Sequence, residues 1–302
     1  MRRRVASLVL AAAACLAAPT LNTAHAEAAE DAAASARAND TALPPIPGPP
    51  PPPAELGGEY EQGGWIRGTA PFDTVSASFN GEPLAFDPAD RSFFVGLDRD
   101  AGSSARLVFT ARDGQQRIHT LDIDPRDWQI QRVNVAKRPG GSSEEWWKRR
   151  EPEWLAIRDA RAKDTGAEGW KQDFIWPVAG RISGRFGRQR IYQGEPGSYH
   201  SGIDIAPGNG VPFVAPADGV VVLARTGFSL EGGIVIIDHG AGLNSAFIHL
   251  SRLAVAEGDR VEQGQVLGNV GASGRATGPH LHWSLMWNES RLDPLLFTGP
   301  MP

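Results

Sequence analysis

Short runs in which apolar and polar residues alternate fill the chain between residues 59 and 135. A period of two places the apolar side chains on one face, which is typical of half-buried β-strands. Asn-Gly at 80–81 and Asp-Gly at 113–114 separate neighbouring runs, and both dipeptides favour tight hairpin turns. The pattern therefore predicts a small N-terminal β-sandwich module over residues 55–136. The expected strands are 65–68, 75–79, 92–95, 106–109 and 118–123.

Helical spacing replaces this alternation over residues 137–172, which we predict to be a helical connector. Ser142 followed by Glu145 predicts a capping box at the start of a helix. Pro152 is expected to interrupt the helix and to start a second helical segment. We interpret the segment as an amphipathic helix packed between two domains, in preference to a sugar-binding strip of tryptophans. The apolar residues at helical spacing are Trp147, Trp154 and Leu155.

From residue 173 to residue 302 the helical period disappears and glycine becomes frequent. Closely spaced Gly and Pro residues bound short apolar runs, a pattern typical of strands joined by glycine-rich loops. We expect a C-terminal antiparallel β-sheet domain here, so that the chain is all-β apart from the connector. Residues 188–199 are expected to form a long loop that lines a groove. The expected strands are 175–178, 220–223, 233–238, 245–249, 265–269 and 282–286.

The first 26 residues have the pattern of a secretory signal peptide. Arg2–Arg4 form a positive end, residues 5–18 form an apolar stretch, and residues 24–26 read Ala-His-Ala, as at a cleavage site. The apolar stretch is too short to favour a membrane-spanning helix. Residues 1–26 therefore predict export to the periplasm or cell envelope, with no stable membrane insertion after cleavage. Alanine and then proline dominate residues 27–54, which predicts an extended linker.

Composition narrows the class of protein further. Of the 302 residues, 41% are hydrophobic and 22% are charged, as in globular proteins. The formal net charge of −5 and the lack of a long basic run in the sequence argue against a nucleic-acid partner. The single cysteine, Cys15, lies in the predicted signal peptide, so the sequence offers no disulfide framework.

Candidate chemistry is concentrated in two short motifs of the C-terminal segment. His200 and Asp204 form an H-x-x-x-D motif, and His280 and His282 form an H-x-H motif. Imidazole and carboxylate groups are good zinc ligands, and a catalytic zinc takes three protein ligands and leaves a fourth position open. The first motif and one histidine of the second would complete such a set. His249 adds another imidazole near the end of a predicted strand.

The spacing within each motif sets a geometric condition on such a site. Side chains two apart on a strand point to the same face, so His280 and His282 are expected to face one cleft, where one binds a metal and the other stays free. Four residues of extended strand span roughly 13 Å, too far for His200 and Asp204 to share a metal. We therefore expect the segment to bend at Gly202 or to pass from a turn into a strand.

These motifs carry a resemblance to a known family. The segment from about Phe174 to Phe297 resembles the LytM/lysostaphin-type family of zinc peptidoglycan endopeptidases. The order of the motifs makes the match specific, because H-x-H alone is a weak signal. The matching stretches are 176–178, 183–187, 200–204, 215–219, 238–240, 249–251, 258–261, 264–265, 278–282 and 293–294.

The resemblance implies a role for each candidate residue. It implies that His200, Asp204 and His282 hold the zinc, and that His249 and His280 serve catalysis. The residues themselves leave open which of His249 and His280 is the general base and which stabilises the oxyanion.

Two further positions of the resembling segment have no catalytic role in our interpretation. His239 fits the family pattern, and we interpret it as a structural residue. Many members have a tyrosine where this chain has Phe247, so a role of that hydroxyl group is not carried over.

The residues and the resemblance together predict an exported zinc metalloendopeptidase, a peptidoglycan hydrolase acting on stem peptides. D-Alanyl-diaminopimelate cross-links are expected rather than glycyl-glycine bridges, because no SH3-like cell-wall-targeting domain follows in this sequence. The alternative is a non-catalytic LytM-type activator of a cell-wall amidase. Such regulators lack one or more zinc ligands, whereas all five positions are filled here.

Overall fold

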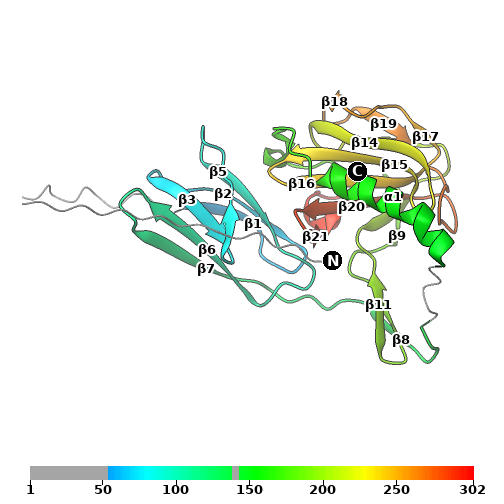
Figure 1. The fold of residues 1–302 in the computed structure, drawn as a ribbon, viewed down its shortest axis with the longest axis horizontal. Helices are drawn as coiled ribbons and strands as arrows, with labels where there is room; N and C mark the ends of the chain where they lie inside the picture. Colours follow the sequence, from blue (N-terminus) through cyan, green and yellow to red (C-terminus); the bar gives the residue numbers. More distant parts are fainter. Residues whose placement is uncertain (1–53, 138–142) are drawn as a thin grey trace, which may run out of the picture. The chain divides into compact units, whose positions relative to one another are not determined.

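The structure is a computed structural model that describes residues 54–137 and 143–302 (Figure 1). The described residues belong to one compact unit. The predicted signal peptide, residues 27–53 of the predicted linker and Ser142 lie outside the described residues. Among the helices that the structure describes, none is long and apolar enough to cross a membrane.

Two small sheets packed face to face confirm the predicted β-sandwich. Their strand orders are β1-β2-β5 and β4-β3-β6-β7. Strand β6 shows the expected alternation, because Leu107 and Phe109 are buried while their neighbours are more exposed. The strands are β1 (Glu55–Glu59), β2 (Trp65–Thr69), β3 (Thr74–Phe79), β4 (Glu82–Leu84), β5 (Ser92–Gly96), β6 (Ser104–Ala111) and β7 (Gln116–Asp122).

The segment 188–199 is a β-hairpin, so the prediction of a long loop is wrong. Strand β10 (Gln189–Tyr192) pairs with β11 (Glu195–Tyr199), and strand β8 (Ile130–Val133) extends the hairpin in parallel on the other side of β10. Gln193 and Gly194 both have positive φ values, 47° and 92°, as a two-residue hairpin turn requires. Gln-Gly lacks the side chain that makes Asn-Gly an evident turn signal, which explains the error.

A single helix in the described part of the chain, α1 (Glu144–Arg161), forms the predicted connector, but its start and its course through Pro152 differ from the prediction. Its N-cap is Ser143, whose hydroxyl accepts a hydrogen bond from the backbone N–H of Trp146 at 3.2 Å. Pro152 lies inside the helix without ending it. This proline is exposed, so water can satisfy the carbonyl that loses its helical partner.

Helix α1 packs against one sheet of the C-terminal segment rather than between two domains (Figure 1). Its small and aliphatic residues Ala156, Ile157 and Ala160 contact buried residues of strands β14, β15 and β16. Trp147 and Trp154 remain about half exposed, at 49% each. The helix therefore forms a cover on one face of that sheet, and its tryptophans are not the residues that bury it.

The C-terminal segment is the predicted antiparallel β-sheet domain. Its main sheet has the order β18-β14-β15-β16-β20-β12-β9, with β21 paired to β20, and a smaller sheet has the order β13-β19-β17. Phe213 of the small sheet packs on Phe247 of the main sheet, with 5.2 Å between ring centres. The elements are β9 (Arg181–Gly184), β12 (Ile203–Ala206), β13 (Pro212–Val214), β14 (Gly219–Phe228), β15 (Gly232–Gly240), β16 (Leu243–Leu250), β17 (Arg252–Leu253), β18 (Arg260–Val261), β19 (Val266–Asn269), β20 (Leu281–Trp287) and β21 (Ser290–Leu292), with short 3₁₀ turns η1 (Gly169–Lys171) and η2 (Pro294–Leu296).

The strand predicted at 175–178 does not form. Only Phe174, just before it, makes an isolated bridge, to Thr298. Pro177 has no N–H to donate to a strand partner, although its carbonyl accepts a bond from Val214 at 2.8 Å. The apolar side chains of this stretch nevertheless help fill the core, since Val178 is buried.

Aromatic residues join the sandwich to the C-terminal segment. Phe94 of β5 is 1% exposed and belongs to the same buried cluster as Phe297 and Trp283. Trp65 stacks near Phe94 and donates its indole N–H to the carbonyl of Leu296 at 2.8 Å. The packing thus crosses the boundary between the predicted modules, and the division at residues 136 and 173 stays a prediction.

Candidate metal centre

The segment from His200 to Asp204 passes from a turn into a strand, as its spacing required. Strand β11 ends at Tyr199 and β12 begins at Ile203, so His200 lies outside both strands. Gly202 permits this path by its size, because a Cβ there would lie 2.3 Å from the carbonyl oxygen of Trp283. The close approach of this segment to β20 brings His200 next to that strand.

Strand pairing brings the two distant motifs together. Asp204 on β12 and His282 on β20 are direct partners in the antiparallel ladder. Side chains of direct cross-strand partners have Cβ atoms about 4.5–5.5 Å apart. The sheet topology therefore determines the contact between the H-x-x-x-D and H-x-H motifs.

Three ligand atoms converge at this point. His200 Nε2 lies 3.0 Å from Asp204 Oδ1 and 3.0 Å from His282 Nδ1, and His282 Nδ1 lies 2.8 Å from Asp204 Oδ1. All three atoms lie within 4.8 Å of one another. Two neutral imidazoles and one carboxylate suit zinc, since each offers a lone pair to a common centre.

The backbone beside these side chains is shaped to leave room for them. A Cβ on Gly184 of the neighbouring strand β9 would lie 2.2 Å from Asp204 Oδ2 and 3.1 Å from His200 Cε1. Any larger residue would push the carboxylate away from the imidazoles. The donor set and this cradle together fit a bound zinc ion.

The charges at this point favour an ionised carboxylate. Burial acts to raise the pKa of Asp204, but the contacts with His200 and His282 outweigh it and hold that pKa far below its ordinary value. Burial lowers the pKa of His282. Burial also acts to lower the pKa of His200, but the contact with Asp204 outweighs it, so this pKa is raised. Asp204 therefore supplies a negative charge at neutral pH.

A backbone carbonyl orients the ring of His200. Its Nδ1–H donates to the carbonyl of Arg185 at 3.0 Å, which leaves Nε2 with a lone pair toward Asp204 and His282. Arg185 lies in a stretch that the sequence matched to the family, but its carbonyl had no predicted role. A backbone acceptor of this kind has no side-chain signal in a sequence.

His280 and His249 each keep one ring nitrogen free. The Nδ1–H of His280 donates to the carbonyl of Gly278 at 2.8 Å, and that of His249 donates to the carbonyl of Ser273 at 2.9 Å. The free Nε2 of His280 lies 3.7 Å from Asp204 Oδ1, so His280 and His282 face one site as expected. The rings of His249 and His280 have centres 4.7 Å apart.

His249 reaches the site through an uncommon backbone conformation. Strand alternation would place it on the core face with Phe247, whereas His282 pairs with Ile248 on the other face. His249 has a φ of 69°, in the left-handed region, which turns its side chain out of the alternation. The burial of His249, at 7% exposed, lowers the pKa of its imidazole and favours the neutral form.

Helix α1 braces His249 through Glu231, which the sequence did not single out. The backbone N–H of His249 donates to the Glu231 carbonyl at 2.9 Å. Arg150 of α1 makes two hydrogen bonds to the Glu231 carboxylate, at 2.6 and 2.7 Å, and a third to Glu153. These contacts link helix α1 to Glu231, the residue directly before β15.

His239 and Phe247 lie in the core. His239 is fully buried and bonded through its two ring nitrogens to the Asp218 carbonyl at 2.7 Å and the Ser245 hydroxyl at 2.8 Å. Phe247 is fully buried between Phe213 and Trp283. Both environments suit packing residues.

Comparisons with known proteins agree with this fold. Residues 198–294 match the model of Peptidase family M23. The chain is 38% identical over 124 residues to a DD-carboxypeptidase/endopeptidase Mpg of Neisseria meningitidis, covering 40% of this chain and 28% of that protein. It is 36% identical over 129 residues to the lipoprotein NlpD/LppB homolog of Pseudomonas aeruginosa, covering 43% of this chain and 39% of that protein. A crystal structure of a putative M23 peptidase from Pseudomonas aeruginosa aligns over 79% of this chain and 95% of that one, with 28% identity and a TM-score of 0.60.

The sheet, the His-Asp-His group and these matches agree: the C-terminal segment resembles the M23 peptidases, and residues 198–294 match the model of that family. The chain spans only about a quarter to two-fifths of the length of these curated relatives. The structural match is longer and includes residues ahead of the peptidase domain.

Proposed function

We propose that the chain is an exported zinc metalloendopeptidase that hydrolyses peptide cross-links of bacterial peptidoglycan. The observation that carries this proposal is the convergence of His200 Nε2, Asp204 Oδ1 and His282 Nδ1, with the free Nε2 of His280 beside them. In this proposal the three converging residues are the zinc ligands. The signal peptide at 1–26 would direct the protein to the periplasm or cell envelope.

A zinc ion held there would act as a Lewis acid that polarises the scissile carbonyl and makes a water molecule more acidic. Asp204 would neutralise part of the positive charge and stay ionised. Through Nε2, which carries a lone pair in the neutral ring, His249 or His280 would accept a proton from the attacking water, and a ring protonated there would donate a hydrogen bond to the developing oxyanion. Their Nδ1 atoms are fixed on backbone carbonyls, so each ring presents the same nitrogen to the substrate.

The bond that we propose is the D-alanyl-diaminopimelate cross-link. Two relatives support it by their names, the Neisseria protein above and the peptidoglycan DD-endopeptidase ShyA of Vibrio cholerae, which is 38% identical over 122 residues. We also propose the division into a sandwich module at 55–136, a connector at 137–172 and a peptidase domain at 173–302.

A second function is a non-catalytic activator of a cell-wall amidase. Two relatives favour this second function. They are the NlpD/LppB homolog above and the cell division protein DipM of Caulobacter vibrioides, which is 32% identical over 134 residues. The filled set of histidines and Asp204 favours the enzyme, because an activator has no need for a complete set of zinc ligands.

Digestion of purified diaminopimelate-containing sacculi separates the two functions. The zinc-loaded protein should convert cross-linked muropeptide dimers to monomers, seen by mass analysis after glycan digestion, and a chelator-treated sample should not. Stem peptides should stay attached to the glycan. Unchanged dimers, together with release of whole stem peptides only when an amidase is added, would support the activator and overturn the enzyme.

A further inference from the structure

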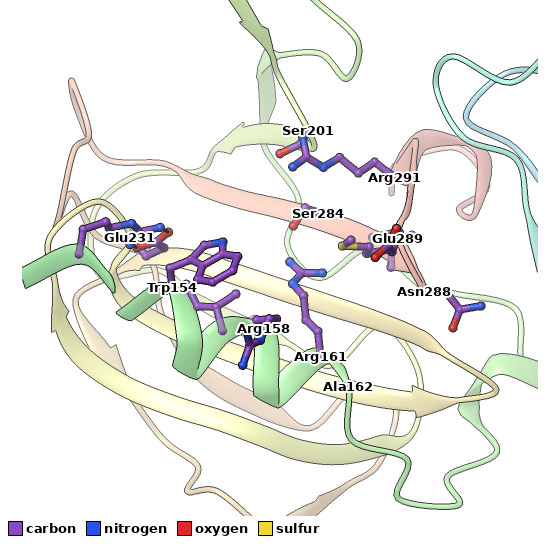
Figure 2. A pocket seen from close by; sticks show the side chains of 14 residues that line it. Trp154, Arg158, Arg161, Ala162, Ser201, Glu231, Ser284, Asn288, Glu289 and Arg291 are labelled. Carbon is purple, nitrogen blue, oxygen red and sulfur yellow. Dashed lines mark hydrogen bonds and ion pairs between the residues drawn. The ribbon is translucent and has the colours of Figure 1, made fainter. Parts of the chain in front are cut away.

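A cavity of about 510 Å³ lies between helix α1 and strand β20, beside the candidate metal centre (Figure 2). In Figure 2 the side chain of Arg161 extends from α1 toward β20, and that of Arg291 extends toward Ser201. The residues used below are Trp154 and Arg161 of α1, Ser201, Ser284, Glu289 and Arg291.

The cavity continues the sheet face that carries the candidate ligands. Ser284 is two residues beyond His282 on β20, so it shares that face at roughly 7 Å along the strand. Ser201 directly follows His200. An extended peptide advances at most about 3.6 Å per residue, so a peptide at the metal would reach the cavity within about two residues of the cut bond.

Two guanidinium groups in this cavity lack an acidic partner. Within residues 54–137 and 143–302, neither Arg161 nor Arg291 forms an ion pair; Arg161 donates to the amide oxygen of Asn244 at 2.5 Å. Burial and the nearby charge of Arg291 lower the pKa of Arg161 to about 10, which still leaves it charged at neutral pH. Arg161 has one amide partner and Arg291 lies 5.5 Å from the ring centre of Tyr199, so neither cation is neutralised and both can bind an anion.

The acids of the cavity do not cancel this charge. The carboxylate of Glu231 is held by both terminal nitrogens of Arg150, at 2.6 and 2.7 Å. Glu289 is exposed and lies at the turn between β20 and β21. Arg158, a third cation of the cavity, forms an ion pair with Asp159 at 2.7 Å. The cavity is therefore positive where Arg161 and Arg291 lie.

We propose that this cavity is a subsite for a carboxylate of the peptide substrate, within about two residues of the cut bond, bound by Arg161 and Arg291. This proposal rests on the proposed peptidase function. Trp154 packs against the apolar part of the same substrate residue. Stem peptides that keep this carboxylate free are then preferred over those in which it is a carboxamide.

A carboxylate accepts charge-assisted hydrogen bonds from a guanidinium group, whereas an isosteric carboxamide has no charge and only one oxygen acceptor. A hydrogen bond to a charged group contributes enough for about a ten- to hundredfold difference in affinity. The two ligands have nearly the same shape, so the difference reports the charge.

The test is calorimetric binding of a cross-link-derived stem peptide in two forms, with a free carboxylate and with a carboxamide next to the amide to be cut. Wild-type protein should bind the carboxylate form about tenfold or more tightly. Arg291→Gln and Arg161→Gln should each remove most of this preference, and Glu289→Gln should preserve or increase it. Arg149→Gln, an exposed residue of the same helix, is the matched control and should preserve it.

Equal affinity of wild-type protein for the two forms would overturn the proposal, and so would an unchanged preference in both Arg161→Gln and Arg291→Gln. If Arg161→Gln unfolds, the exposed Arg291→Gln decides. Hydrolysis of the same peptides separates this outcome from the larger proposal. Cleavage of both forms with equal KM would overturn the carboxylate subsite but leave the proposed peptidase function intact. Carboxylate-selective binding without any cleavage would support the subsite and overturn the proposed peptidase function.

Discussion

The guanidinium group of Arg99, in the segment after β5, lies 4.4 Å from the ring centre of Tyr199, the residue before His200. Arg99 is only 5% exposed and donates to the carbonyl of Gly187 at 3.1 Å. The N–H of Gly187 in turn donates to the carbonyl of His200 at 2.9 Å. A sandwich residue thus contacts the side chain that precedes a candidate metal ligand and, through Gly187, the carbonyl of that ligand.

Replacing Arg99 with Gln should therefore weaken zinc binding and activity, although Arg99 does not touch the site. Loss of a group that orients a ligand typically costs about 10- to 100-fold in metal affinity, and we expect the lower end because Arg99 acts through the backbone. Arg99→Lys should restore part of it. Zinc affinity measured by competition with a chelating dye checks this prediction.

Arg67→Gln provides the control for that experiment. Arg67 also bridges the sandwich and the C-terminal segment, through an ion pair with Asp173 at 3.4 Å, but it lies away from the histidines. It should lower stability without changing zinc affinity. Equal loss of zinc affinity in both variants would mean that Arg99 acts only through the general packing of the sandwich.

Changing His200, Asp204 or His282 to Ala should lower the zinc content below one ion per chain and reduce hydrolysis by at least about a hundredfold. Each change removes one of three converging lone pairs. Elemental analysis and hydrolysis of a cross-linked dimer measure the two effects. His119→Ala, a histidine of strand β7, is the control and should change neither. Full zinc occupancy in all three variants would refute the ligand assignment.

His249→Ala and His280→Ala should keep their zinc and still lose activity by roughly 100-fold or more, as expected for positioned proton-transfer or oxyanion groups. Their Nδ1 atoms are bound to carbonyls and their Nε2 atoms are free, which fits proton transfer better than ligation. Zinc content and kcat should be measured on the same sample. A variant that loses its zinc contains a ligand instead.

The sequence predicted the parts of this site that depend on local pattern. The alternation of apolar residues identified β3 and β6, and a short apolar run identified β16. The spacing of His200 and Asp204 demanded the bend that the structure has. The cross-strand pairing of Asp204 with His282 is a long-range property that no local pattern contains, and the resemblance implied only that the two residues hold one zinc ion.

Other features depended on backbone geometry that residue types only weakly signal. The φ of 69° at His249 is uncommon for a histidine, and the turn at Gln193 has no typical dipeptide. Pro152 suggested a helix break, yet its exposed position lets the helix continue. Arg99 and Arg185 act through backbone carbonyls of distant residues, which a sequence does not reveal.

The pH dependence of stability should contain a contribution from His239. Its burial lowers the pKa to about 4 from an ordinary value near 6.5. Between these values the unfolded chain binds the proton and the folded chain does not, so the free energy of unfolding falls as the pH falls. The contribution is fully present above pH 6.5 and amounts to about 3 kcal/mol.

Denaturant unfolding of metal-free wild-type protein and His239→Gln between pH 7 and pH 4 checks this sign. The wild-type protein should lose about 3 kcal/mol more than the variant over this range. The difference between the two proteins cancels the titration of the other histidines. Parallel curves would show that His239 does not stay neutral in the fold.

Zinc titration of the metal-free protein, followed by hydrolysis of a purified cross-linked muropeptide dimer, tests the central claim most directly. Hydrolysis should rise with added zinc and saturate at one equivalent per chain in the wild-type protein, while Asp204→Ala should stay at background over the same range. Hydrolysis that is independent of zinc, or that is the same in Asp204→Ala, would contradict a peptidase built on His200, Asp204 and His282.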